Sequence, residues 1–177
     1  MKQSIAAVIA VLSMAVSGCG GDRSIDGSVY IESIDRSPVE VDCVRDEEDS
    51  PFLPEEVTVN LRFEPDPAVA IELQANAIMT SYRIDYVLST GDDLPFYDNG
   101  VSLFLAPGES KGLPIRAVSY VQKDECKEFA DAVNATATLT LTGHADDNSQ
   151  DEFELRGDFD IIFDDFIVSA APPDAGI

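Results

Sequence analysis

Short runs in which apolar and polar residues alternate dominate the chain after residue 27. The pattern is clearest in three stretches, residues 56–63, 134–142 and 151–166. Alternation at every second residue is typical of a strand with one buried and one exposed face. Less regular runs predict further strands at residues 28–34, 39–44, 77–89, 101–106 and 113–121. About seven to eight strands separated by turns predict an all-β fold, an antiparallel β-sandwich, for residues 28–167.

The alternation also predicts which side chains form the core. In residues 77–89 one face would carry Ile78, Thr80, Tyr82, Ile84, Tyr86 and Leu88. Five apolar side chains of the last two strands are expected to be buried together: Leu139, Leu141, Phe159, Ile161 and Phe163. Residues 123–133 show helical spacing and predict one short helix. Residues 143–150 would form the last hairpin loop, which includes His144.

The first 18 residues have the pattern of a signal peptide. Lys2 precedes an apolar run, Ile5 to Val16, which is shorter than the ~20 residues of a membrane span. Val16-Ser17-Gly18-Cys19 follows, and it resembles the lipobox of bacterial lipoproteins. The resemblance implies cleavage before Cys19 and attachment of lipid to its thiol, which would anchor the chain to a membrane.

The segments on either side of the predicted sandwich are rich in small residues, and the C-terminal one is also rich in proline. Residues 19–27 would be a flexible tether and residues 168–177 a disordered tail. In Gram-negative members an Asp after the lipidated cysteine favours the inner membrane, whereas this chain has Gly20, so the outer membrane is expected. By strand pattern the remainder resembles small, uncharacterised lipoproteins with an immunoglobulin-like β-sandwich. Its lack of Trp excludes an antibody-type core around a buried Trp.

Three cysteines are present, and lipid on Cys19 would leave two. In an exported, oxidising setting Cys43 and Cys126 are expected to form a disulfide that closes a loop of about 80 residues. The alternative is two free, buried thiols.

Acidic residues outnumber basic ones by 34 to 11, which gives a formal net charge of −23. Such a surface repels nucleic acid and anionic lipid head groups, so no nucleic-acid partner is expected and lipid must hold the chain to the membrane. It would attract a cationic partner, such as a cationic envelope protein, or a divalent cation. The alternative is that the acidity serves solubility or a salty habitat.

The chain has no recognisable catalytic motif, and its single histidine offers no constellation with a nucleophile. We therefore predict no enzymatic activity. No cofactor is expected other than Ca²⁺, for which Asp146, Asp147, Asn148 and Asp151 supply several oxygens. These residues are also typical of turns. The sequence thus predicts a non-enzymatic structural or interaction module, with a Ca²⁺-dependent binding protein as the alternative.

Overall fold

A computed structural model describes residues 27–43, 55–129, 131–146 and 152–164. Its elements within these ranges are β1 (Gly27–Ile34), β2 (Val39–Asp42), β3 (Glu55–Pro65), η1 (Ile71–Leu73), β4 (Ala77–Leu88), β5 (Asp93–Leu105), β6 (Ser110–Val118), α1 (Tyr120–Glu125), η2 (Cys126–Glu128), β7 (Val133–Ala145) and β8 (Glu152–Asp164). The two η elements are single turns of 3₁₀ helix.

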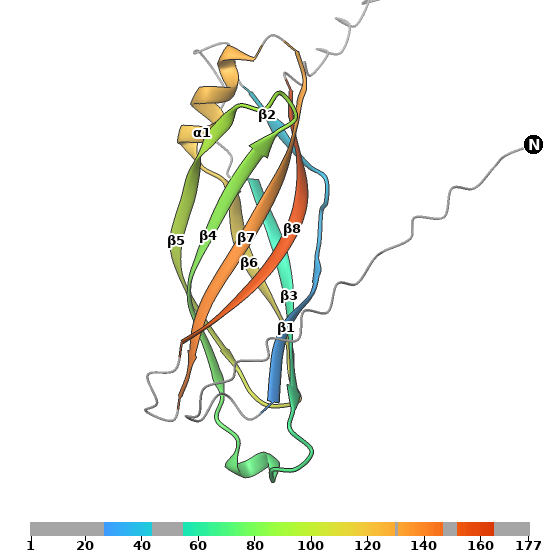
Figure 1. Ribbon diagram of the computed structural model, residues 1–177, viewed down its shortest axis with the longest axis vertical. Coiled ribbons are helices and arrows are strands. Elements are labelled where there is room, and N and C mark those ends of the chain that lie inside the picture. The colour runs from blue at the N-terminus through green and yellow to red at the C-terminus, as the bar shows by residue number, and fades with distance from the viewer. Residues whose placement is uncertain (1–26, 44–54, 130, 147–151, 165–177) are drawn as a thin grey trace, which may run out of the picture.

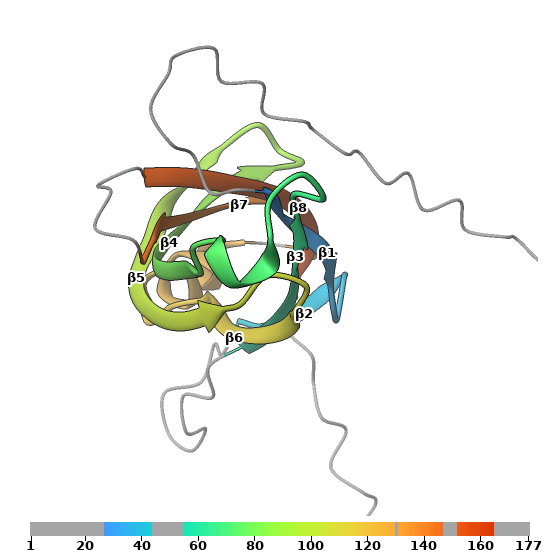
Figure 2. The ribbon, with the colours of Figure 1, turned by 90° about the horizontal axis from the view of Figure 1, so that it is seen from below.

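The strands form two sheets that pack face to face. One has the order β1-β3-β6 and the other β2-β8-β7-β4-β5. Figure 1 shows the long strands running along one axis, and Figure 2, seen from below, shows the two sheets around a common core. This arrangement confirms the expected immunoglobulin-like β-sandwich. One pair departs from the antiparallel prediction, because β2 runs parallel to β8.

The β1–β2 segment passes from one sheet to the other. β1 pairs with β3, and Asp35 continues this contact by donating its N–H to the carbonyl of Thr58. Two residues later, Ser37 Oγ accepts a hydrogen bond from the N–H of Asp160 in the other sheet. The crossing makes β2 a neighbour of β8, which is why this short edge strand is parallel to its partner. Both sheets are thereby tied to the same stretch of chain.

The predicted core of the last two strands is confirmed. Its five members are each at most 3% exposed: Leu139, Leu141, Phe159, Ile161 and Phe163. Ile84 and Tyr82 of β4, the cross-strand partners of Leu139 and Leu141, are also buried, which makes this part of the larger sheet the centre of the molecule.

The predicted face of β4 is wrong in its first part. Ile78 is only half-buried and Thr80 is exposed, while Ala77 and Met79 are fully buried. A register shift between Met79 and Ser81 causes the difference. Because an extra residue in one strand reverses the orientation of all that follow, the predicted face is correct only from Tyr82 onward.

Several boundaries also differ from the predictions. The helical segment ends at Glu128 instead of residue 133, and β6 covers Ser110–Val118 instead of residues 113–121. β5 begins at Asp93, well before the expected residue 101. The helix begins at Tyr120 instead of residue 123, because Ser119 and Gln122 form a capping box at its start. Gly27, expected in the tether, is the first residue of β1. The predicted signal peptide, the rest of the tether and the tail lie outside the described residues.

Candidate functional site

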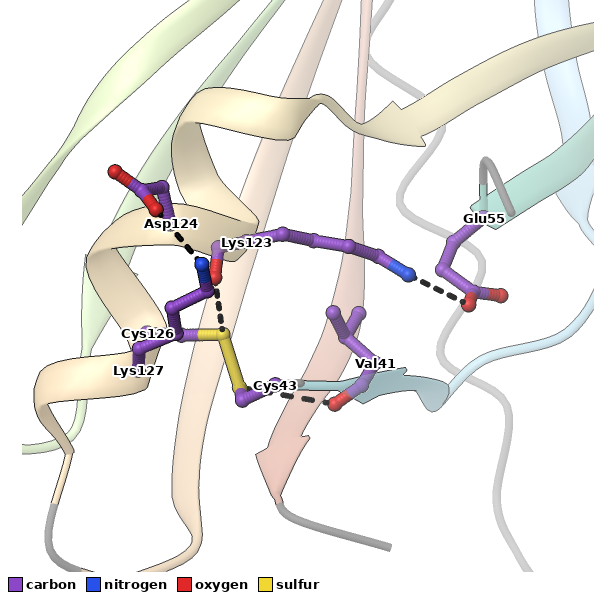
Figure 3. The surroundings of a disulfide bond; sticks show 7 residues. All are labelled: Val41, Cys43, Glu55, Lys123, Asp124, Cys126 and Lys127. Carbon is purple, nitrogen blue, oxygen red and sulfur yellow. Dashed lines mark hydrogen bonds and ion pairs between the residues drawn. A yellow bond between two sulfur atoms is a disulfide. The ribbon is translucent and has the colours of Figure 1, made fainter. Parts of the chain in front are cut away.

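A disulfide joins Cys43, just after β2, to Cys126 at the end of α1 (Figure 3). The two Cα atoms are 5.6 Å apart, and the cysteines are 2% and 0% exposed. The predicted pairing is therefore confirmed, and the alternative of two free thiols is wrong. Cys43 is also fixed through its backbone, since its N–H donates to the carbonyl of Asp164. The bond attaches the edge strand of the larger sheet to the helix that precedes β7.

A partly buried ion pair lies beside this disulfide. Lys123 is 8% exposed, and its Nζ lies 3.3 Å from Oε1 of Glu55 at the start of β3. Figure 3 shows the lysine side chain extending from the helix toward Glu55. A buried ammonium group is costly without a nearby opposite charge. The carboxylate therefore accounts for the burial of Lys123, and the pair connects α1 to the smaller sheet.

Two tyrosines of β4 reach across the interior to the backbone of β6. Tyr82 Oη donates to the carbonyl of Arg116 and accepts from its N–H, at 3.2 and 3.1 Å. Tyr86 Oη donates to the carbonyl of Ala117 at 2.7 Å. Loss of hydration on burial raises the pKa of Tyr82 to about 12, and it raises the pKa of Tyr86 still further. Both hydroxyl groups therefore remain protonated donors that satisfy the outer edge of β6.

The predicted calcium ligands are only partly placed. Asp146 Oδ1 accepts the N–H of Asn76 at 2.8 Å, and its Oδ2 accepts the Asn76 side-chain amide at 2.6 Å. Asp147, Asn148 and Asp151 lie outside the described residues. Within the part of the chain that the structure describes, no three acidic, His or Cys side chains are grouped around a possible metal position. Calcium binding stays a prediction.

His144 lies within β7 and not in a loop, contrary to the prediction. It is half-buried, and its Nδ1 lies 2.7 Å from the carbonyl oxygen of Ala145. The structure thus assigns this imidazole a local contact with its own strand.

Among the described residues, a groove with a volume of about 450 Å³ lies on the outer face of the larger sheet. We call it the sheet groove. It extends over the ends of β4, β7 and β8 and is walled by the β1–β2 crossing. The side chains that give it its chemistry are Pro38, Val87, Asn134, Thr136, Asp160 and Ile162.

The sheet groove combines apolar side chains with one carboxylate in its lining, and a second carboxylate lies next to it. Val87 is 61% exposed, although it lies in a central strand of the sheet, and Ile162 is half-buried nearby. The exposed Asp160 lines the groove, and the exposed Glu40 pairs with Ile162 in the β2–β8 ladder. An apolar floor with acidic groups around it suits a partner that presents an apolar side chain next to a cation.

Sequence reasoning missed this groove. The available signal was small: Ile161-Ile162-Phe163 breaks the alternation with an apolar residue at an outward position. Val87 interrupts the polar face of β4 in the same way.

Known proteins offer few parallels to this chain. No protein-family model matches it, and no curated protein matches it either. Among solved structures it is similar to the crystal structure of a point mutant of CfaE, the CFA/I adhesin of enterotoxigenic E. coli. The identity is 10% and the TM-score 0.26, over 83% of this chain. The chain spans about half of that adhesin, 49%, and a likeness at this level carries no functional argument.

No helix among the described residues has the length and apolar character needed to cross a membrane.

Proposed function

We propose that the chain is a lipid-anchored protein of the bacterial cell envelope, whose β-sandwich acts as a non-enzymatic structural or protein-interaction module. The observation that carries the proposal is the Cys43–Cys126 disulfide. It accounts for two of the three cysteines and leaves Cys19, at the end of the lipobox, for lipid. Stable disulfides are typical of compartments outside the reducing cytosol, which supports export.

Lipid attachment also fits the charge of the chain. A surface with this acidic excess is repelled by anionic head groups, so the protein needs a hydrophobic anchor to stay at the membrane. Each buried methylene contributes about 0.8 kcal/mol, and two or more acyl chains give stable anchoring. With Gly20 after the cysteine, the outer membrane of a Gram-negative envelope is the proposed location.

The sheet groove is the proposed docking surface of the module. The carboxylate of Asp160, that of the neighbouring Glu40 and the exposed Val87 favour a cationic envelope protein that inserts an apolar side chain.

Mass spectrometry of the chain purified from bacterial membranes tests the anchor. The expected product lacks residues 1–18 and carries the added mass of diacylglycerol on Cys19. The variant Cys19→Ala should lack the added lipid mass and leave the membrane fraction. The double variant Cys43→Ala and Cys126→Ala should keep both the lipid mass and its place in the membrane fraction. A membrane-bound wild-type chain without added lipid mass would overturn the proposal.

Capture from solubilised envelopes tests the docking surface. The wild-type chain should retain a partner at low salt and release it as salt screens the charges. Val87→Asp should lose the partner by placing a charge on the groove floor. Phe104→Asp is the matched control, because Phe104 is 48% exposed on β5, outside the groove. Equal capture by both variants would exclude the groove as the interface.

A further inference from the structure

The β3–β4 connection, residues 66–76, turns its polar groups inward. The side chain of Gln74 is directed into the loop and is 7% exposed. Its Nε2 donates to the carbonyls of Asp66 and Val69, at 2.9 and 2.8 Å, and its Oε1 accepts the N–H of Asp66. Asp66 Oδ1 in turn accepts the N–H of Ala68. The loop therefore has a defined conformation, which the hydrogen bonds of the Gln74 side-chain amide hold in place.

The same loop turns apolar side chains outward. Leu73 is 76% exposed and Ile71 is 51% exposed, both on η1. Exposed loops of soluble proteins usually carry polar or turn-forming residues, and apolar ones gathered at one point indicate a contact surface. We call this pair, Ile71 and Leu73, the apolar tip.

The apolar tip lies at the end of the sandwich where the tether would begin. Gly27, the first residue of β1, pairs with Pro65, the last residue of β3 before the loop. In Figure 1 the green η1 turn is at the bottom, while α1 is at the opposite end. Only eight peptide units separate Cys19 from Gly27. Even fully extended they span about 28 Å, so lipid on Cys19 would hold this end close to the membrane.

We propose that the apolar tip inserts into the head-group region of the zwitterionic phospholipid surface to which Cys19 anchors the chain. The inference rests on the proposed lipid anchor. Tethering raises the effective concentration of the tip at the surface to the millimolar range, so two apolar side chains suffice for contact. Glu64 and Glu72 are exposed beside the tip and disfavour an anionic lipid surface.

Insertion of the tip would set the orientation of the whole domain. With two attachments at one end, the long axis stands away from the membrane. The sheet groove, at the far ends of β4 and β8, then faces the surrounding compartment and a partner there.

The chain has no Trp, so one introduced Trp reports on its site alone. The full chain carrying Leu73→Trp is produced in bacteria, purified from membranes and reconstituted into phosphatidylcholine vesicles. Its emission should shift to the blue relative to the same Trp variant that also carries Cys19→Ala, which has no lipid and stays in solution, and brominated phosphatidylcholine should reduce the emission of the lipidated chain. Tyr120→Trp is the control, because Tyr120 is 61% exposed on α1 at the opposite end, and its emission should not change.

Adding Ile71→Asp to Leu73→Trp should abolish both the shift and the quenching, with an unchanged circular dichroism spectrum because both positions are exposed. Replacing phosphatidylcholine with phosphatidylglycerol should weaken the quenching.

Mass spectrometry of each sample separates the two ways in which the inference can fail. A chain without lipid mass overturns the anchor and this inference with it. A lipidated chain whose Leu73→Trp emission is neither shifted nor quenched overturns the inference alone. A shift that rises with the protein-to-lipid ratio but resists brominated lipid would indicate a second copy of the chain, which also overturns it. Stronger quenching in phosphatidylglycerol would contradict the choice of a zwitterionic surface.

Discussion

Removal of the Cys43–Cys126 disulfide should cost a large part of the domain's stability. The perturbation is the double variant Cys43→Ala and Cys126→Ala, which leaves no reactive thiol in the core. The cysteines are separated by 83 positions, and the loop between them contains β3 to β6. In the chain-entropy model a loop of this length stabilises the folded state by about 4.5 kcal/mol, because the unfolded chain is confined.

Urea unfolding followed by circular dichroism is the assay. With an m-value of about 2 kcal/mol/M, the loss corresponds to a midpoint lower by about 2 M. The uncrosslinked chain exposes more surface when it unfolds, so the free energies extrapolated to water should be compared, and not the midpoints alone. Cys19→Ala, which leaves the disulfide in place, is the control and should unfold like the wild-type chain.

A loss below about 1 kcal/mol would refute this reasoning. It would mean that the contacts of β2 with β8 and of α1 with its neighbours already restrict the chain in the unfolded ensemble, or that the bond strains the native fold by a similar amount.

Three further predictions concern packing, pH and calcium. Gly143→Ala should destabilise the domain by about 1–3 kcal/mol in urea unfolding. The added Cβ would lie 2.6 Å from the carbonyl oxygen of Ile78 and 2.7 Å from the Phe153 ring. Gly100→Ala is the control and should be near neutral, because the nearest atom to its added Cβ would be 3.9 Å away. Burial raises the pKa of Tyr82 in the folded state to about 12 from the ordinary value of 10.0. The contribution of this shift to the free energy of unfolding is therefore complete below pH 10 and is lost at about 1.4 kcal/mol per pH unit as the pH rises to 12. Tyr82→Phe should remove this part of the dependence of the unfolding free energy on pH, measured by urea unfolding at alkaline pH, and an unchanged dependence would contradict the assignment. If the Asp146 segment binds calcium, the melting midpoint should be higher in millimolar Ca²⁺ than in EDTA, whereas equal midpoints would exclude a calcium site.

Much of the fold could be predicted because burial enforces a period of two. β7 alternates without interruption and β8 departs from alternation only near its end, at Ile162, so their core residues are evident from the sequence. β4 was assigned correctly only from Tyr82 onward, because a bulge changes the period at one residue and leaves no distinct mark in the sequence. The start of β5 was missed because Pro95 and Gly100 interrupt its pattern. The capping residues Ser119 and Gln122 did offer a signal for the true start of the helix.

The candidate sites were harder to predict, since they depend on which distant residues meet. The disulfide followed from counting cysteines in an exported chain. The sheet groove could not be predicted, because it needs the parallel pairing of β2 with β8 and the crossing that brings Pro38 beside Ile162. The apolar tip could not be predicted either: Ile71 and Leu73 look like core residues until the loop structure shows them outside.

The position of Gly27 determines how the domain would respond to mechanical force. A pull on the chain at Gly27, directed along the long axis, acts parallel to β1. The hydrogen bonds between β1 and β3 are perpendicular to that direction, so several must rupture together instead of opening one after another. Beyond them, the parallel β2–β8 ladder and the disulfide would bear the load next. A domain attached by this end would therefore resist traction on a captured partner far better than its equilibrium stability suggests.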